Sequence, residues 1–248
     1  RLPLTAAPRG FVLPINKISI NSVLLGAAAG VVSGFATALF LFLLDRATSF
    51  RTGHALLVYA LPVAGLAVGF VYERFGSAIK AGNNLVIDTI HDDGPEIPFR
   101  MAPMVFLGTV LTHLFGGSAG REGTAVQMGA SLSDWLAHRL KLDKGTRRRL
   151  VAAGVAGGFG SVFGTPIAGT IFGLEFVVLG RVEYDALVPA LVASIVGDLV
   201  TRALGIVHTP YPEAPAVTLD PLLLGKWLLF ALAVSATTAL FIELVHRL

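Results

Sequence analysis

Hydrophobic residues run along the chain in eight segments, which charged residues, Pro and Gly separate. We place these segments at residues 20–44, 55–73, 101–116, 124–140, 150–163, 166–179, 185–206 and 222–246. The longer ones reach the roughly 20 residues that a helix needs to cross a bilayer, where it satisfies its own backbone hydrogen bonds. The pattern therefore predicts an all-α integral membrane protein.

Several segments are too short or too interrupted to cross a bilayer simply. Those that flank Gly120, Gly164 and Pro166 run about 14–17 residues, and their ends fall inside otherwise apolar sequence. Broken helices of this kind are tolerated in a membrane where they line a cavity. We expect a bundle in which some helices start or stop at membrane depth.

The composition supports a membrane protein and excludes several kinds of chemistry. Hydrophobic residues make up 54% of the 248 residues and charged ones 14%, and the mean hydropathy is +0.74. A soluble domain of this length would need more polar surface. The chain has no cysteine, which excludes disulfides, thiolate metal sites and cysteine nucleophiles. We expect neither a cofactor nor a metal site.

Glycines recur at spacings that suit close helix packing. Gly26, Gly30 and Gly34 lie four residues apart, as do Gly65 and Gly69, and residues 154–164 read GVAGGFGSVFG. Small residues at this spacing let two helix backbones approach each other. For the first two sets, packing alone is the favoured interpretation.

The distribution of Lys and Arg predicts how the chain is oriented. Residues 1–18 carry Arg and Lys among prolines and read as an interfacial leader on the cytoplasmic side, whereas 207–221 lack both and read as an extracytoplasmic loop. The densest basic cluster lies between two predicted segments and consists of Lys141, Lys144, Arg147, Arg148 and Arg149. We read it as a cytoplasmic orientation signal of a multi-pass cell-membrane protein. A nucleic-acid or anionic-lipid patch is the alternative, and we expect no nucleic-acid partner.

A charged pair interrupts the apolar sequence at GGSAGREGTAVQMG, residues 116–129. An ionisable residue inside the membrane costs about 3 kcal/mol, so Glu122 is a functional candidate by default. The surrounding glycines leave the backbone open, and a helix that begins near Thr124 would direct unpaired N–H groups at the same point. Such groups favour an anion. The alternative is a buried pair between Arg121 and Glu122 that only satisfies itself.

These features together suggest a proton-coupled gate. An ionised Glu122 carboxylate is itself an anion, so it can occupy a site made of amide donors until it is protonated. Burial disfavours its charged form and nearby amide dipoles favour it, so the two protonation states can compete. Protonation would release the side chain and admit an anion.

Two further helix starts carry polar residues. Gly82, Asn83 and Asn84 precede a short apolar turn, and Asn at such a place caps the helix or donates its amide hydrogens to a ligand. Capping alone is the commoner role. The other start, Gly164-Thr165-Pro166, has Pro at the first helical position.

The motifs resemble those of the CLC family of anion channels and anion/proton antiporters. GREGT at 120–124 is similar to that family's GREGP gate motif, and GFGSVFGTPIAGTIFGLE at 158–175 is similar to its segment around N-A-P-L-A-G. The resemblance implies that Glu122 is the gating, proton-accepting glutamate and that Arg121 and Gly123 border an outer anion site. It also implies a CLC-type broken-helix bundle with two inverted repeats, and a homodimer with one pore in each subunit.

Departures from the family pattern indicate which anion is moved. Where chloride-selective members have G-S-G-I-P, residues 82–86 read GNNLV, and Thr124 replaces the proline of the gate motif. Both changes resemble the fluoride/proton antiporter branch, which implies fluoride export coupled to proton import. A chloride/proton antiporter or chloride channel of the same family is the alternative. We take Gly82, Asn83, Asn84, Arg121, Gly123 and Thr124 as the anion-binding set, with Asn83 as the preferred side-chain donor and Asn84 as the fallback.

The resemblance also predicts that the chain is a fragment. Residues 19–206 correspond to a first inverted repeat, and 222–248 to the opening helix of a second whose remainder is missing. The partners would then be a halide and protons, the bilayer, a second subunit and the absent C-terminal half. Glu175 lies one position from the family's inner proton-transfer glutamate, and Phe176 occupies that place, which puts the inner proton route in doubt.

Two other functions compete with transport. Residues 116–120 match the G-x-S-x-G string of a hydrolase around Ser118, with His113 nearby, but that motif needs a preceding strand where the sequence predicts a helix. We therefore expect no enzyme. A purely structural membrane scaffold would predict that replacing Glu122 changes no anion flux.

Overall fold

The computed structural model describes residues 19–91, 94–176, 184–208, 218 and 220–247. The described residues form helices and turns, with no strand among them. The chain divides into two compact units, Arg1–His208 and Thr209–Leu248, and each is treated by itself. The predicted leader at 1–18 and most of the predicted loop at 207–221 lie outside the described residues.

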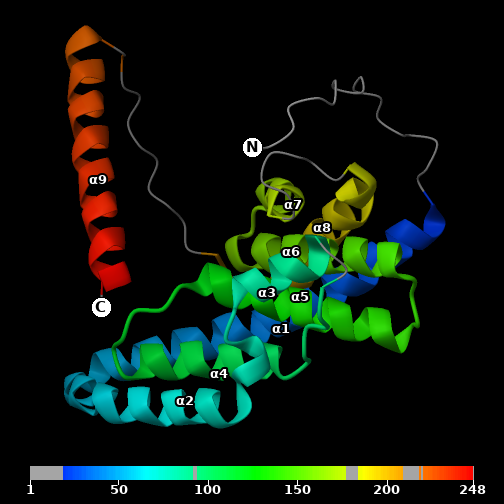
Figure 1. Cartoon of the computed structure of the whole chain (residues 1–248), viewed down its shortest axis with the longest axis horizontal. Helices are drawn as coiled ribbons and strands as arrows, with labels where there is room; N and C mark the ends of the chain where they lie inside the picture. Colours follow the sequence, from blue (N-terminus) through cyan, green and yellow to red (C-terminus); the bar gives the residue numbers. More distant parts are fainter. Residues whose placement is uncertain (1–18, 92–93, 177–183, 209–217, 219, 248) are drawn as a thin grey trace. The chain divides into compact units, whose positions relative to one another are not determined.

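The first unit is a bundle of broken helices (Figure 1). Its α-helices are α1 Ile20–Gly53, α2 Leu61–Phe75, α3 Asn83–His91, α4 Met101–Leu114, α5 Arg121–Arg139, α6 Lys144–Phe163, α7 Pro166–Glu175 and α8 Leu187–Ala203, with 3₁₀ turns at Ala55–Ala60, Ser77–Ile79 and Tyr184–Ala186. The hydrophobic segments predicted within this unit each coincide with one of these helices. The all-α prediction is therefore confirmed.

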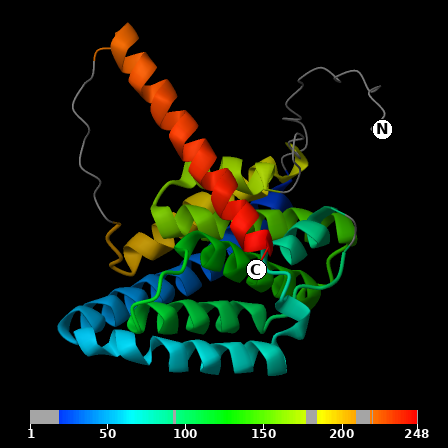
Figure 2. The ribbon, with the colours of Figure 1, turned by 60° about the vertical axis from the view of Figure 1, so that its left-hand side comes forward.

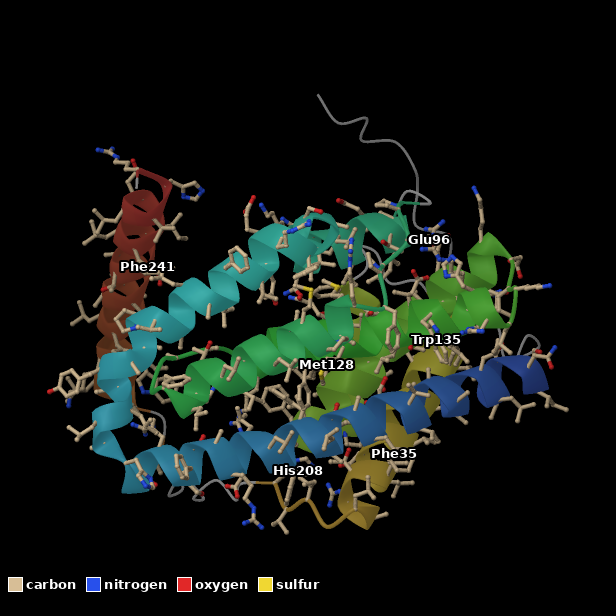
Figure 3. All side chains as sticks on the ribbon, turned by 90° about the horizontal axis from the view of Figure 1, so that it is seen from below. Phe35, Glu96, Met128, Trp135, His208 and Phe241 are labelled. Atoms are coloured by element: carbon tan, nitrogen blue, oxygen red, sulfur yellow. The ribbon has the colours of Figure 1, made fainter. Side chains whose placement is uncertain are left out.

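Helix α6 lies at the centre of the bundle and packs against α1, α5, α7 and α8. It runs antiparallel to α5, and the two backbones meet at Gly129 and Gly154, where a Cβ on either residue would overlap the carbonyl oxygen of the other. The glycine-rich 154–164 stretch thus acts in packing, as its spacing predicted. Side chains such as Met128 fill the interior between these helices (Figure 3), and Met128 is 2% exposed.

The glycines of α1 form a second close contact, with α8. A Cβ added to Gly26 would lie 2.6 Å from the carbonyl oxygen of Pro189, and one added to Gly34 would lie 2.7 Å from that of Gly197. The two helices therefore run parallel in near-backbone contact. By contrast, Gly65 and Gly69 of α2 have no described atom within 4 Å of such a Cβ, so packing at this pair is not seen within the described residues.

Two helices begin earlier than the hydrophobic pattern predicted. Helix α5 starts at Arg121 rather than near Thr124, and α6 starts at Lys144 rather than at residue 150. The N-cap Asp143 explains the second difference, because its carboxylate accepts a hydrogen bond from the N–H of Thr146 at 3.1 Å. Most of the basic cluster that we placed between segments is consequently helical.

Within the part of the chain that the structure describes, three helical stretches are long and apolar enough to cross a membrane: Ile20–Gly53, Ala55–Phe75 and Pro221–Arg247. Helix α2 packs alongside α4 (Figure 2) and has no buried residue of its own. In the second unit, α9 spans Pro221–Arg247, and Asp220 accepts a hydrogen bond from the N–H of Leu223 at 2.7 Å. This helix matches the predicted 222–246 segment.

Candidate functional site: two converging helix starts

The first turns of α3 and α5 lie against each other. The Nε2 of Gln127 on α5 donates a hydrogen bond to the Oδ1 of Asn83 on α3, at 3.0 Å. A Cβ built on Gly123 would lie 3.8 Å from the Nδ2 of Asn83 and 3.9 Å from the Nε2 of Gln127. Two of the three helix starts that the sequence singled out are therefore neighbours, although 38 residues or more separate them along the chain.

Helix α3 is placed at this point by a glycine turn and by its apolar face. Gly82 has φ +56, in the left-handed region that glycine adopts without strain, and the N–H of Asn84 is bonded to the carbonyl of Ala81 at 3.0 Å. Beyond the turn, Leu85 and Val86 are buried in the main core, where α3 packs on α5 and α6. The helix thus starts in a fixed position beside Gly123.

Helix α5 begins without a side-chain cap. Its N-cap is Gly120, with φ −69 and ψ 137, and no side chain accepts a hydrogen bond from its first turn in the described part of the chain. The first amide N–H groups of a helix have no partner within it, and they carry the positive end of the helix dipole. Because α5 begins at Arg121, the free amides are those of Arg121, Glu122 and Gly123. This end of α5 is suited to an anion.

Glu122 is in the first turn of α5 and its side chain is exposed. Its Oε2 lies 2.9 Å from the position of a Cβ on Gly120, so the carboxyl group folds back over the N-cap. Among the described residues no ion pair joins it to Arg121, and neighbouring helix positions point about 100° apart. The self-satisfied pair that we considered as an alternative is not seen.

The hydroxyl of Thr124 contacts α4 and the first turn of its own helix. Its hydroxyl lies 2.6 Å from that of Thr109 on α4 and donates to the carbonyl of Gly120 at 3.2 Å. Its amide belongs to the helical ladder, since α5 starts three residues earlier than we expected. Thr124 therefore ties the first turn of α5 to α4, and its hydroxyl is already engaged.

A cavity of about 390 Å³ adjoins the start of α5 and lies between α2, α4 and α5. Gly120, Gly123 and Gln127 line one side of it, and Tyr72 and Thr112 line another. The cavity brings polar groups of three helices to the first turn of α5. The first turn of α5 therefore borders an open space with polar side chains in its wall.

The other residues that the sequence singled out lie elsewhere. Asn84 is exposed, unlike the half-buried Asn83. Helix α7, which starts after Thr165, packs on α6 and α8; its last residue, Glu175, is exposed, and Phe176 packs against Phe172 with ring centroids 5.3 Å apart.

Ser118 follows helix α4 rather than a strand, so the structural context of a hydrolase elbow is missing. The Nδ1 of His113 contacts the carbonyl of Thr109 at 2.9 Å. Neither residue has the surroundings that the string motif requires.

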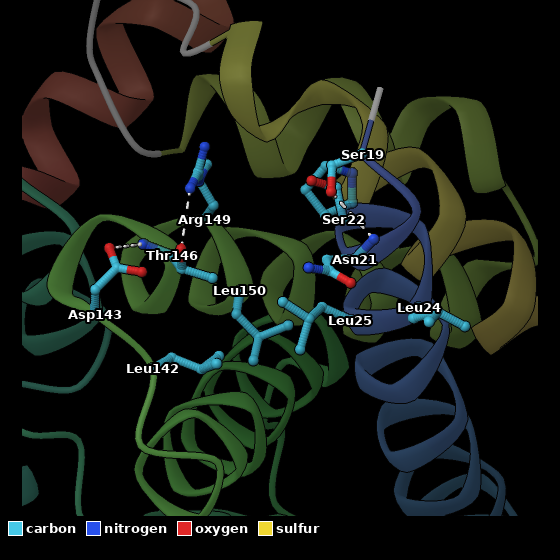
Figure 4. Close-up of a pocket in the computed structure, with 11 residues that line it drawn as sticks. Ser19, Asn21, Ser22, Leu24, Leu25, Leu142, Asp143, Thr146, Arg149 and Leu150 are labelled. Carbon is cyan, nitrogen blue, oxygen red and sulfur yellow. Dashed lines mark hydrogen bonds between the residues drawn. The ribbon is translucent and has the colours of Figure 1, made fainter. Parts of the chain in front are cut away.

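A second cavity, of about 750 Å³, lies at the N-terminal end of α6 (Figure 4). It is lined by the starts of α1 and α6, including Ser19, Asp143 and Arg149, and the Nη2 of Arg149 donates to the hydroxyl of Thr146 at 3.0 Å. It contains none of the predicted anion-binding residues. No group of His, Asp or Glu able to hold a metal occurs among the described residues.

Sequence reasoning did not identify Gln127 or Thr109 as part of the site. Gln127 lies four residues after Gly123, a spacing that puts both on one face of a helix. That periodicity, counted from the GREGT motif, is the signal that could have pointed to Gln127. Nothing in the sequence pointed to Thr109.

Comparison with known proteins identifies the family. Residues 64–248 match the model of the voltage gated chloride channel family. A chloride/fluoride channel protein of Pseudomonas syringae pv. tomato is 48% identical over 225 residues, which are 90% of this chain and 50% of that protein. The H(+)/Cl(-) exchange transporter ClcA of Vibrio vulnificus is 28% identical over 75% of this chain and 43% of its own length.

Solved structures agree with the sequence comparison. The crystal structure of a CLC-type fluoride/proton antiporter matches with a TM-score of 0.79 and 36% identity, covering 86% of this chain and 54% of that one. A slow cyanobacterial Cl-/H+ antiporter matches with a TM-score of 0.64 at 19% identity, which concerns the fold alone. The chain spans about half the length of the relatives it matches. It is an all-α membrane chain and belongs to the voltage-gated chloride channel (CLC) family.

Proposed function

We propose that the full-length protein exports fluoride in exchange for protons, along a pathway bordered by the starts of α3 and α5. The observation that carries the proposal is the convergence of these two helix starts, with the amide of Asn83 beside Gly123. Both helices direct the positive end of their dipole toward one point, and the first turn of α5 contributes free backbone N–H groups. A small anion that has lost part of its water finds replacement donors there.

Glu122 is proposed to act as the gate and the proton acceptor. Its carboxylate is an anion attached to the same helix turn, so in the ionised state it competes for the free amides of α5. Protonation removes the charge, and the neutral side chain no longer competes with a halide. Proton uptake and anion entry are thereby coupled at one residue. Arg121 and Gly123 border the site, and Thr124 holds the turn in place through Thr109.

Fluoride is proposed over chloride because of Asn83. A chloride site with a serine offers one hydroxyl hydrogen, whereas the Asn83 amide offers two N–H donors, and fluoride is the more tightly hydrated of the two anions. The names of the similar proteins include both ions. A chloride/proton antiporter or a chloride channel is therefore the competing function within the family.

We further propose how the chain is placed in the cell membrane. Residues 19–206 would form the first of two inverted repeats and 222–248 the first helix of the second, with the remaining repeat supplying the rest of the pore in a homodimer. The N-terminus and the basic start of α6 would face the cytoplasm, and 207–221 the other side. A single cysteine introduced at Lys141, in a full-length protein without other cysteines, should react with a membrane-impermeant maleimide only from the cytoplasmic side. Labelling from the outside would contradict this orientation and support the opposite one.

The proposed activity is tested with the purified full-length protein in liposomes. Vesicles loaded with fluoride should release it through the protein faster than vesicles loaded with chloride, and the release should drive protons inward. Protein-free vesicles and a boiled preparation serve as controls. Equal rates for the two ions would contradict the choice of fluoride, and the absence of flux for either ion would contradict transport.

A further inference from the structure

A side-chain hydrogen bond between Asn83 and Gln127 joins the start of α3 to α5. Within the described residues, it is the one side-chain hydrogen bond seen between these two helices. The Nε2 of Gln127 donates to the Oδ1 of Asn83 at 3.0 Å. An Asn side chain presents an acceptor on one side and two donors on the other, so turning the amide over exchanges them. While Gln127 presents its NH₂ group, the Asn83 oxygen faces Gln127 and its nitrogen faces away, because the reversed Asn83 amide would set one NH₂ group against another.

The backbone that carries Gln127 is held in the core. Its neighbours Val126 and Met128 are buried, at 1% and 2% exposed, so the backbone of this turn is fixed in the core. The Nε2 atom lies 3.5 Å from the position of a Cβ on Gly82 and 3.9 Å from that on Gly123. The amide of Gln127 thus lies between Gly82 and Gly123, and side chains at these two positions would crowd it.

With its oxygen held by Gln127, Asn83 keeps its nitrogen for other partners. The Nδ2 atom lies 3.8 Å from the position of a Cβ on Gly123, next to the free amides of the first turn of α5. The donors of the two helices therefore point into one region. If the amide were reversed, an oxygen would occupy that region and would repel an anion.

We propose that Gln127 is a positioning residue that fixes the orientation of the Asn83 amide and thereby sets the preference for fluoride over chloride. This inference rests on the proposed transport function. Gln127 does not itself bind the ion; it acts through Asn83. Its amide does not titrate, so its contribution is independent of pH.

The competing explanation is that the contact only packs α3 onto α5, and a double-mutant cycle in liposomes separates the two. The readout is the ratio of fluoride to chloride flux through the full-length protein. Gln127→Met keeps the length of the side chain and removes the donor, so it should lower the ratio about fivefold, the factor expected from one net hydrogen bond. In the background of Asn83→Ala the same change should leave the ratio unaltered.

Ser131→Ala is the matched control on the same helix. It removes another hydrogen bond from α5 to a different segment, that of Ser131 Oγ to the carbonyl of Pro98 at 2.9 Å, and it should leave the ratio unchanged. Gln127→Glu provides a second variant. A carboxylate at this position only accepts, so Asn83 would turn its nitrogen toward it and its oxygen toward the ion, and the fluoride rate should fall below that of Gln127→Met.

The outcomes are distinct. An unchanged ratio in Gln127→Met, or a fall that persists in the Asn83→Ala background, would overturn the inference and leave the transport function standing. If Gln127→Met does not fold, Gln127→Glu decides by the same ratio: a fall supports the inference and an unchanged ratio overturns it. A wild-type protein that moves no fluoride would overturn the proposed function and this inference together.

Discussion

The buried ion pair between Asp134 and Arg147 allows a quantitative test of how the bundle is held together. Asp134 on α5 is 0% exposed, and the side chain of its partner Arg147 on α6 is 14% exposed. The Oδ2 of Asp134 accepts a hydrogen bond from the N–H of Ile97 at 2.7 Å and one from the Nη2 of Arg147 at 3.0 Å. Replacing Asp134 with Ala would leave a partly buried guanidinium without its carboxylate and the Ile97 amide without its acceptor.

The expected loss is large because charge is left behind. Breaking a buried pair from one side costs about 3–5 kcal/mol. For a domain of about 150–250 residues this lowers the melting temperature by roughly 6–20 °C, and the fall is smaller for the longer full-length protein. The double variant Asp134→Leu with Arg147→Met removes both charges and should recover the part of that loss that comes from the unpaired guanidinium, while the Ile97 amide stays without its acceptor. The stabilisation from the pair itself is therefore expected to be small, while each partner alone is destabilising.

The assay is the fraction of monodisperse full-length protein that survives heating in detergent. Asp88→Asn is the matched control, because Asp88 is exposed on α3 and its change should shift stability by less than about 0.5 kcal/mol. A melting temperature of Asp134→Ala equal to that of Asp88→Asn would refute the reasoning. So would a double variant as unstable as the single one.

Two further predictions concern helix packing and capping. Gly30→Ala places a methyl group 2.6 Å from the carbonyl oxygen of Ala193 and should destabilise the protein by about 1–3 kcal/mol. Gly69→Ala is the control, because a methyl group there meets open space and should not destabilise the protein. Equal melting temperatures for the two variants would contradict the α1–α8 contact. The hydroxyl and N–H of Thr146 hold the pKa of the Asp143 carboxyl below its ordinary value of 3.8. The ionised carboxylate therefore stabilises the start of α6 at pH values above 3.8. This stabilisation is lost as the pH falls through the lowered pKa of the folded protein. Asp143→Ala should therefore lower the melting temperature at neutral pH, and a difference from wild type that persists unchanged below pH 3.8 would contradict this assignment.

The positions of the helices followed from hydrophobic patterning, but their exact starts did not. The 101–116 and 185–206 segments became α4 and α8 with small changes at their ends. Helix α6 starts six residues before residue 150, because Asp143 caps it and because Arg147 is paired inside the bundle. Hydropathy alone reads Arg147 as a solvated loop residue, since it does not register the buried Asp134 on another helix.

The candidate site was predicted in part. The motif around Glu122 and the polar start at Asn83 were both visible as interruptions of apolar sequence, and the structure brings the two starts together. The contact that joins them depends on Gln127, an ordinary polar residue in a helix whose role becomes visible only from its partner. The engagement of Thr124 with Thr109 likewise depends on how α4 lies against α5.

The central claim is that the Glu122 carboxylate and a halide compete for the same amide donors, and Glu122→Gln tests it most directly. The substitution keeps the shape of the side chain and removes its charge and its proton exchange. Fluoride flux and proton flux should be measured together in liposomes that contain the full-length wild type or the variant. The account predicts that the variant still passes fluoride but no longer moves protons with it; proton transport coupled to fluoride as tightly as in the wild type would contradict the account.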